Sequence, residues 1–235
     1  MDNLVNKRIA IIPARGGSKR IPRKNIINFL GKPMIAWTIE AARESGCFDR
    51  ILVSTDDPET AETAQEFGAE APFLRENNAD DHSPVSEATW HALNQAMSYW
   101  GESYNIVVQL MANCPLRDSE DIKNCVKAFD TQKRTFQISC FRFGWMNPWW
   151  ATKLDGEGRP TQLFPEAAVQ RSQDLPDLFC PTGAVWIAQA KQFLESKTFY
   201  GEDNRFEPLS WKSAIDIDDQ DDLEFALAVA QHHET

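Results

Sequence analysis

The chain has 235 residues, with 24 Lys and Arg against 35 Asp and Glu, so its formal net charge at pH 7 is −11. This acidic balance argues against a nucleic-acid-binding protein and against a surface for anionic membranes. No apolar run approaches the ~20 residues that span a bilayer, and residues 1–8 lack the apolar core of a signal peptide. Five scattered cysteines without Cys-x-x-Cys spacing favour reduced thiols over disulfides or a zinc site. We therefore expect a cytoplasmic protein.

Short apolar runs alternate with amphipathic stretches along the first 143 residues. Continuous apolar runs rich in β-branched residues are typical of buried strands, and apolar residues at helical spacing predict helices. The pattern predicts strands at residues 9–12, 50–55, 104–111 and 135–143, helices at residues 34–45, 58–67, 84–100 and from 118 or 119 onward, and a polar loop at residues 76–83. This alternation predicts an α/β fold, with a Rossmann-like, mostly parallel sheet and crossover helices on both faces.

Residues 144–181 differ in character from the sequence around them. Trp145, Trp149 and Trp150 cluster near the start of this stretch, and residues 155–158 are typical of a hairpin turn. The tryptophans would suit either a local core or a contact between subunits. We favour the second interpretation, a β-hairpin arm that makes a homodimer.

After this arm, the pattern returns to single strands and helices. It predicts a strand at residues 182–187, a helix at 189–196, a last strand at 212–218 and a closing helix at 219–231. We see no low-complexity linker and no internal repeat. The sequence therefore predicts one domain, residues 1–235, that carries the arm at residues 144–181.

A basic loop follows the first strand directly. Within ten residues it carries five cations, namely Arg15, Lys19, Arg20, Arg23 and Lys24. Gly16 and Gly17 can adopt positive φ, and Ser18 and the loop amides can donate to phosphate oxygens. The loop matches neither the Walker A nor the Gly-x-Gly-x-x-Gly pattern. A solvated basic turn is the alternative, but five close cations repel one another without an anion, so we favour an anion site.

An acidic pair lies near the end of the chain, in the stretch Asp216-Ile217-Asp218. Alternate residues of a strand face the same side, so both carboxylates would point one way. Two such carboxylates can hold Mg²⁺ through oxygen ligands. The alternative is that Asp218 and its neighbour Asp219 only cap the next helix. Because the chain also carries a candidate phosphate-binding loop, and a cation would neutralise phosphate charge, we favour the metal site.

At residues 12–25 the chain resembles the signature of the cytidylyltransferases that activate sialic acids and related nine-carbon keto acids. These enzymes are the CMP-sialic, CMP-pseudaminic and CMP-legionaminic acid synthetases. The resemblance extends over almost the whole chain, with further matching motifs at residues 31–34, 53–56, 73–75, 114–117, 171–176 and 215–218. It implies a nucleotide-diphospho-sugar transferase fold and a dimer in which the arm around Trp149 closes the active site of the neighbouring subunit.

The resemblance also implies a reaction and a set of site residues. CMP would pass from CTP to the anomeric hydroxyl of a nonulosonic acid, with Mg²⁺ as cofactor and pyrophosphate as product. Either Asp216 or a metal-bound hydroxide would take the proton of the sugar. The implied sites are catalytic Arg15, Lys19, Lys24 and Asp216; nucleotide-binding Ala14, Arg15, Gly16, Gly17, Ser18, Lys19, Lys24, Asn25, Arg75 and Ser86; sugar-binding Gln173; and metal-binding Asp216 and Asp218.

The chain departs from the sialic acid members at several positions. Met111 replaces a glutamine expected to face the nucleotide, and Ser172 and Cys180 replace arginines that would suit a sugar carboxylate. Thr182 replaces an asparagine. These changes leave the acceptor open. The alternatives are another keto-acid sugar such as 3-deoxy-manno-octulosonate, which the basic loop disfavours, and a non-catalytic nucleotide-binding module.

Overall fold

The computed structural model describes residues 6–75 and 84–231 of the chain. The polar loop predicted at residues 76–83 lies outside the described residues. Among the helices of the described part, none is long and apolar enough to cross a membrane.

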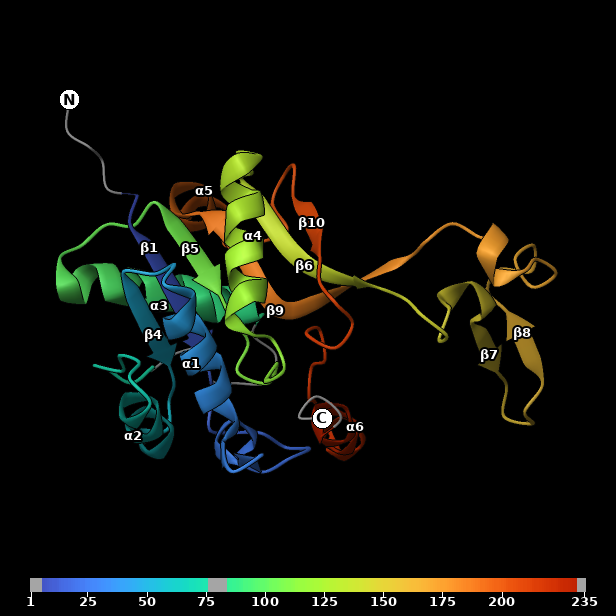
Figure 1. Ribbon diagram of the computed structural model, residues 1–235, viewed down its shortest axis with the longest axis horizontal. Coiled ribbons are helices and arrows are strands. Elements are labelled where there is room, and N and C mark those ends of the chain that lie inside the picture. The colour runs from blue at the N-terminus through green and yellow to red at the C-terminus, as the bar shows by residue number, and fades with distance from the viewer. Residues whose placement is uncertain (1–5, 76–83, 232–235) are drawn as a thin grey trace.

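A six-stranded sheet forms the centre of the protein (Figure 1), in the order β10-β6-β9-β5-β1-β4. The strands are β1 (Arg8–Pro13), β4 (Arg50–Ser54), β5 (Ile106–Gln109), β6 (Phe136–Arg142), β9 (Phe179–Gln189) and β10 (Arg205–Pro208). β1 runs parallel to β4 and β5, and β10 runs parallel to β6. β9 alone among these six is antiparallel to its neighbours. The mostly parallel sheet predicted from the sequence is therefore confirmed.

Helices cover both faces of this sheet, as the alternation of apolar runs predicts. They are α1 (Met34–Ser45), α2 (Pro58–Glu66), α3 (Val85–Trp100), α4 (Ser119–Thr131), α5 (Ala190–Ser196) and α6 (Gln220–Gln231). Apolar residues of α1 and α4 pack in one core cluster, and those of α3 and α5 pack in a second cluster. Even-numbered residues of β1 face the first cluster and odd-numbered ones the second, as the pleat of a strand requires.

Local sequence sets where several helices begin and end. The side chain of Asp57 accepts a hydrogen bond from the Thr60 amide at 2.9 Å and caps α2, with Pro58 in the first turn. Asp118 and Asp121 form a reciprocal capping box at the start of α4. These caps lie where the sequence predicts them.

The strand predicted at residues 212–218 is wrong. Residues 211–214 form a turn and residues 215–218 an extended loop, because this segment has no neighbouring strand to pair with in the described structure. Conversely, β10 was not predicted, since Arg205–Pro208 is a short, charged edge strand without an apolar run. The two-residue strands β2 (Asn28–Phe29) and β3 (Lys32–Pro33), which pair with each other, were also missed.

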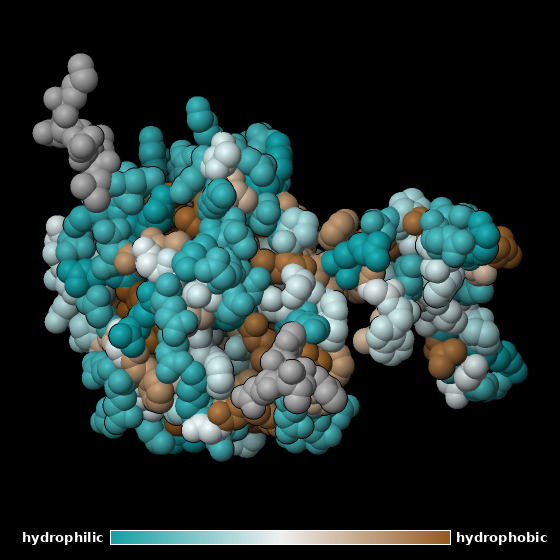
Figure 2. All heavy atoms as spheres, viewed as in Figure 1, coloured by the Kyte–Doolittle hydropathy of each residue, from teal (hydrophilic) through white to brown (hydrophobic). Residues whose placement is uncertain are grey.

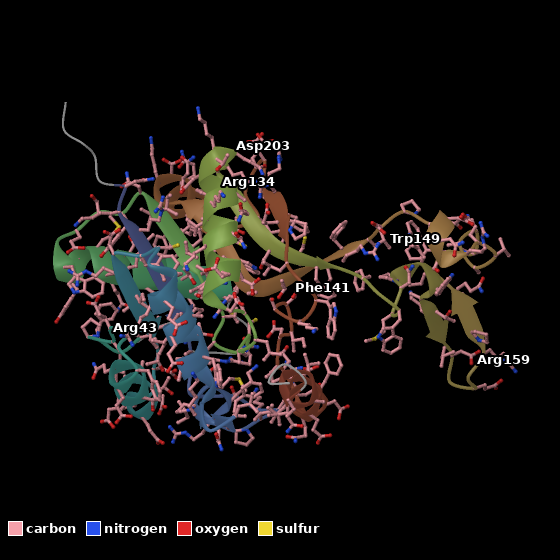
Figure 3. The ribbon with its side chains drawn as sticks, viewed as in Figure 1. Arg43, Arg134, Phe141, Trp149, Arg159 and Asp203 are labelled. Atoms are coloured by element: carbon pink, nitrogen blue, oxygen red, sulfur yellow. The ribbon has the colours of Figure 1, made fainter. Side chains whose placement is uncertain are left out.

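The arm leaves the body between β6 and β9 and projects to one side (Figures 1 and 2). It contains the predicted hairpin, with β7 (Thr152–Leu154) antiparallel to β8 (Pro160–Gln162). Trp149 lies at the end of the arm nearer the body and Arg159 at the hairpin (Figure 3). Trp145 and Val169 are 84% and 88% exposed, so the arm leaves large apolar side chains in water.

An ion-pair network lies at the amino-terminal end of β4. Arg50 donates to Glu102 at 2.6 Å and to Glu70 at 2.9 Å. The hydrogen bond from Arg50, aided by one from Tyr104 and opposed by burial, lowers the pKa of Glu102 to about 2. The first residue of β4 is thereby tied to the segments that follow α2 and α3.

Candidate active site

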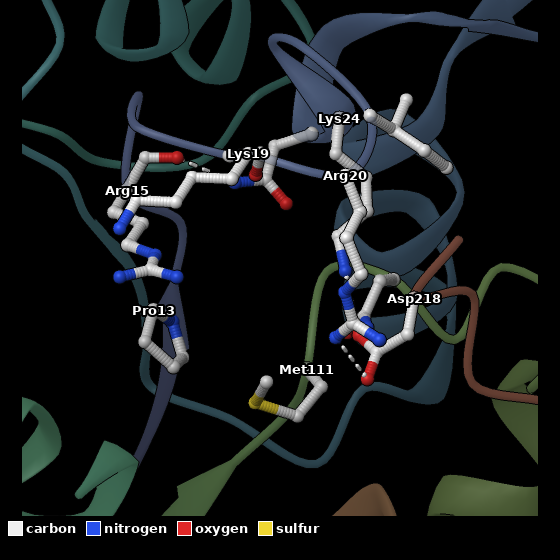
Figure 4. A pocket seen from close by; sticks show the side chains of 11 residues that line it. Pro13, Arg15, Lys19, Arg20, Lys24, Met111 and Asp218 are labelled. Atoms are coloured by element: carbon white, nitrogen blue, oxygen red, sulfur yellow. Dashed lines mark hydrogen bonds and ion pairs between the residues drawn. The ribbon is translucent and has the colours of Figure 1, made fainter. Parts of the chain in front are cut away.

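A cavity of about 190 Å³ opens at the carboxyl ends of β1 and β5 (Figure 4). In an open α/β sheet, ligands bind at this edge. The lining residues are Pro13, Arg15, Ser18, Lys19, Arg20, Ile21, Lys24, Asn25, Met111, Asn113 and Asp218. The cavity therefore brings most of the predicted basic loop together with one carboxylate of the predicted acidic pair.

The basic loop is closed on itself. The Asn25 side-chain amide donates to the Arg15 carbonyl at 2.9 Å, which joins the end of the loop to its beginning. Arg23 precedes the short 3₁₀ helix Lys24–Ile26 and has a φ of 54°, a left-handed conformation that turns the chain back. Arg15 and Lys24 consequently face the same cavity, although they are nine positions apart in sequence.

The positive φ expected for the two glycines of the loop is wrong. Neither Gly16 nor Gly17 has a positive φ. Gly16 is needed for a steric reason instead, because a Cβ there would lie 2.7 Å from the Asp57 Cβ. Its amide donates to the Asp56 carboxylate at 2.9 Å, so a carboxylate occupies the position expected for a phosphate oxygen. Asp56, which lies between β4 and α2, thus contacts the backbone of the loop.

Asp216 and Asp218 converge on one side chain. The Asn113 amide nitrogen donates to an Asp216 oxygen and lies 3.3 Å from Asp218 Oδ1. The backbone amide of Ile217 donates to the Asn113 carbonyl at 2.9 Å, and the Ile217 side chain is fully buried. The two carboxylates therefore share one side, as predicted, although the segment is an extended loop and not a strand.

The two carboxylates have opposite pKa shifts. Burial, and then the negative charge of Asp218, raise the pKa of Asp216 to about 6, and solvent that still reaches this side chain screens part of the effect. Burial would also raise the pKa of Asp218, but hydrogen bonds and charge from Lys24 and Arg20 outweigh it and the net shift is downward. One carboxylate is thus held ionised, while the other retains affinity for a proton.

Arg75, one of the residues expected to bind the nucleotide, is buried beside the loop. Arg75 is fixed by its amide, which donates to the Thr55 carbonyl at 2.7 Å, and its Nη2 lies 4.0 Å from the Asp56 carboxylate. Burial lowers the pKa of Arg75, and the charge of Asp56 opposes this shift. Within the described residues, the Arg75 Nε and the Ser54 hydroxyl are buried and have no hydrogen-bond partner. Buried polar atoms of this kind favour a polar ligand.

The remaining predicted residues lie apart from the cavity lining. Ala14, Gly16 and Gly17 belong to the loop backbone, and Ser86 is buried in the first turn of α3. Gln173 lies on the arm, in the exposed 3₁₀ helix Ser172–Asp174. Because the arm points away from the body, a single chain does not bring Gln173 to the cavity (Figure 1).

Sequence reasoning missed two members of the site. Arg20 was recognised as a loop cation without a role, and Nη2 of this residue pairs with Asp218 at 2.9 Å. Asn113 was not expected in the site, yet its buried side-chain amide donates to Asp216 and to the Ile217 carbonyl. Its place in the loop that follows β5, at the edge of the sheet where ligands bind, is the signal that could have identified it.

The donor set fits a magnesium ion. Within the described residues, no group of three or more His, Cys, Asp and Glu side chains could hold a metal by itself. Mg²⁺ does not require such a group, since it keeps several waters and takes one or two carboxylates together with substrate phosphates. Asp216 and Asp218, which meet at one point beside the basic loop, provide those carboxylates.

The family model described as Cytidylyltransferase matches residues 9–232. The chain belongs to this family. It is 38% identical to the pseudaminic acid cytidylyltransferase of Campylobacter jejuni (strain 81-176) over 94% of each chain. It is 36% identical to the CMP-N,N'-diacetyllegionaminic acid synthase of Legionella pneumophila, over 89% of this chain and 90% of that one. The family resemblance found in the sequence is confirmed.

Solved structures share the fold at low sequence identity. A CMP:2-keto-3-deoxy-manno-octonic acid synthetase in complex with CTP has a TM-score of 0.71 at 18% identity, over 97% of this chain and 99% of that one. The 4-diphosphocytidyl-2C-methyl-D-erythritol synthase of Anaerococcus prevotii has a TM-score of 0.63 at 15% identity, over 96% and 98%. At these identities the likeness establishes the nucleotidyltransferase fold alone.

Proposed function

We propose that this cytidylyltransferase transfers CMP from CTP to the anomeric hydroxyl of a nonulosonic acid and releases pyrophosphate. The observation that carries the proposal is the ion pair of Lys24 with Asp218, at 2.8 Å, which joins the basic loop and the acidic pair in one cavity. Relatives that are 36–38% identical over about nine tenths of the chain bear the names of enzymes of this reaction class.

The basic loop binds the triphosphate in this proposal. Arg15, Lys19 and Lys24 line one cavity and supply the positive charge that phosphate oxygens require. The loop is held in shape by the Asn25 amide on the Arg15 carbonyl before any ligand arrives. Such prearranged donors stabilise charge that develops in a transition state without a reorganisation cost.

The chemical step is an in-line displacement at the α-phosphorus. The anomeric oxygen of the sugar forms the new P–O bond, and the bond between the α-phosphorus and the bridging oxygen of the β-phosphate breaks. Its electron pair leaves with pyrophosphate. We assign the proton of the sugar hydroxyl to Asp216, whose carboxylate accepts a hydrogen bond from Asn113, a residue that lines the cavity. Lys24 remains beside the phosphates, where it offsets the charge of the leaving group.

Asp216 and Asp218 would hold the magnesium ion. When bound there, Mg²⁺ supplies neutralisation of phosphate charge. Asp218 carries the ionised carboxylate that this role needs, because Lys24 and Arg20 keep its pKa low.

The acceptor that we propose first is pseudaminic acid. The relatives named for it are 38% and 36% identical to this chain. The stretch from Arg171 to Pro176 also resembles the pseudaminic branch, in which serine stands at position 172. A legionaminic acid acceptor is the second candidate, supported by a relative of 36% identity.

We further propose a homodimer in which the arm of each chain completes the partner's active site. Two observations support it: Trp145 and Val169 are exposed on the arm, and Gln173 lies away from the cavity of its own chain. Burying such side chains against a second copy would stabilise the pair. Sedimentation equilibrium tests the assembly. A Trp145→Ser, Val169→Ser variant should dissociate, and a monomeric wild-type protein would refute the dimer.

Pyrophosphate release tests the reaction. The protein is mixed with CTP, Mg²⁺ and, in turn, pseudaminic, legionaminic and sialic acids and 3-deoxy-manno-octulosonate, with UTP as the matched nucleotide control. We expect turnover with one or more nonulosonic acids and little with UTP. CTP binding without turnover on any acid would favour the non-catalytic module, and turnover with the octulosonate alone would replace the proposed acceptor class.

A cytoplasmic location completes the proposal. All five cysteines, which lie within the described residues, are free, as is usual for proteins of a reducing compartment.

A further inference from the structure

Asp218 has both carboxylate oxygens engaged by cations of the basic loop. Its Oδ1 accepts a hydrogen bond from Lys24 Nζ at 2.8 Å, and its Oδ2 lies 2.9 Å from Arg20 Nη2. The carboxylate that we assign to the magnesium ion is thus paired with two cations of the loop. A bound cation and Arg20 would compete for the same oxygen.

The two loop cations hold Asp218 in different ways. Lys24 is 14% exposed and also donates to the Ile217 carbonyl at 2.7 Å, so it is anchored at two points. Arg20 is 62% exposed and reaches Asp218 from the solvent side, while it still lines the cavity. Exposed ion pairs are weak, so Arg20 can exchange this partner at little cost, whereas Lys24 cannot.

We propose that Arg20 is a phosphate-binding residue that Asp218 holds in the free protein and releases when nucleotide and cation bind. The inference rests on the proposed function. A phosphate oxygen replaces Asp218 as the partner of Arg20, and the cation replaces Arg20 as the partner of Asp218. In Figure 4, Arg20 and Lys24 approach Asp218 on one side of the cavity, across from Arg15 and Lys19, so Arg20 is placed to complete the ring of cations.

This exchange couples the two ligands. A nucleotide that binds first must separate Arg20 from Asp218, and a cation that binds first must do the same. The second ligand then finds its partner already free, so each ligand favours the other by the same factor. The guanidinium suits this role, because its planar donors match phosphate oxygens as well as a carboxylate.

A double-mutant cycle on CTP affinity without metal tests the exchange. Calorimetry in EDTA compares the wild type, Arg20→Gln, Asp218→Asn and the double variant. In the wild type, Arg20→Gln should weaken CTP binding by about twofold, since the lost phosphate contact is partly offset by the lost ion pair. In the Asp218→Asn background the same substitution should cost roughly tenfold, the full charged contact. An equal fold-change in CTP affinity in both backgrounds would mean that Arg20 acts on CTP only through its charge. That result would overturn the exchange.

A second measurement uses Mn²⁺ without nucleotide, followed by electron paramagnetic resonance. Arg20→Gln should tighten Mn²⁺ binding by about two- to fivefold, the fold-change that an exposed ion pair accounts for. Arg23→Gln is the matched control, since Arg23 is an exposed cation of the same loop that pairs with Asp57 at 2.9 Å and not with Asp218. Unchanged Mn²⁺ affinity in Arg20→Gln, or an equal gain in both variants, would refute the pairing.

The outcomes also separate this inference from the proposed function. A wild-type protein that binds no CTP with or without Mg²⁺ would overturn the function and the phosphate role of Arg20 together. A wild type that binds CTP and turns over, with equal Arg20→Gln factors in both backgrounds, overturns the exchange and leaves the function standing.

Discussion

Lys24→Met should abolish most catalysis while the protein stays folded. The substitution removes two hydrogen bonds, to the Ile217 carbonyl at 2.7 Å and to Asp218 at 2.8 Å. Neither acceptor is left alone, because Asn113 still donates to the Ile217 carbonyl at 3.0 Å and Arg20 still pairs with Asp218. The free energy of unfolding should therefore fall by about 1 kcal/mol, the net contribution of an ordinary hydrogen bond, because no buried acceptor is left without a partner. For a chain of this size that corresponds to a fall in Tm of about 2–4 °C.

The catalytic loss should be much larger than this. A preorganised charge beside the reacting phosphates contributes about 10²–10³ to kcat, or roughly 3–4 kcal/mol. The assay is pyrophosphate release at saturating CTP and acceptor, with thermal unfolding of the same preparation. Lys32→Met is the matched control, since Lys32 is 22% exposed, pairs with Glu40 and does not line the cavity. A folded Lys24→Met protein with kcat within about threefold of wild type would refute the placement of Lys24 at the phosphates.

Three further predictions concern the acidic pair, Gly183 and the ion-pair network around Arg50. The Asp216→Ala, Asp218→Ala double variant should lose Mg²⁺-dependent turnover, and unchanged pyrophosphate release would exclude these two as the metal site. Gly183→Ala should destabilise the protein by about 1–3 kcal/mol in urea unfolding, because its Cβ would lie 2.6 Å from Met111 Cγ; Met111→Ala should restore part of the loss. Glu102→Gln should be less stable than wild type at neutral pH. Because folding lowers this pKa to about 2 from 4.5, the difference should shrink as the pH falls through that window, and a constant difference in urea unfolding would contradict the network.

The parts of the fold that follow from local chemistry were predictable. Apolar β-branched runs gave the buried strands of the parallel sheet, because such strands must be apolar on both faces. Asp57 and Asp118 marked helix starts, because their side chains satisfy amides that the helix leaves unpaired. These signals lie within a few residues, so one sequence suffices to find them.

The parts that depend on distant partners were not predictable. β10 has no apolar run and is a strand only because β6 offers a free edge beside it. The segment around Ile217 has the pattern of a strand but lies beside Asn113, a residue 104 positions earlier that takes its backbone bonds. Both errors come from pairing, which sequence periodicity does not report.

The residues of the candidate site also fall into those that the sequence could identify and those that it could not. The basic loop could be recognised because its cations and glycines are contiguous, and the acidic pair because its two aspartates are two residues apart. Asn113 and Arg20 could not be assigned a role from the sequence. Asn113 acts through Asp216, roughly one hundred positions later, and Arg20 acts through Asp218, roughly two hundred positions later. Gly16 shows a further limit: the sequence suggested that this glycine supplies backbone freedom, whereas the structure shows that it leaves the space that Asp57 takes.

Under the proposed function, position 182 links the choice of acceptor to the placement of the two carboxylates that we assign to the metal. The departures from the sialic acid members include Thr182, whose hydroxyl donates to the Ala214 carbonyl at 3.0 Å in a buried position. Ala214 lies two residues before Asp216, and Thr182 lies next to Gly183, against which Met111 packs. The residue at position 182 therefore contacts the segment that carries Asp216 and lies next to the glycine against which Met111, a residue of the cavity lining, packs. Because the contact between Thr182 and Ala214 is buried, a substitution at position 182 should also disturb the segment that carries Asp216, which limits the side chains that this position can accept.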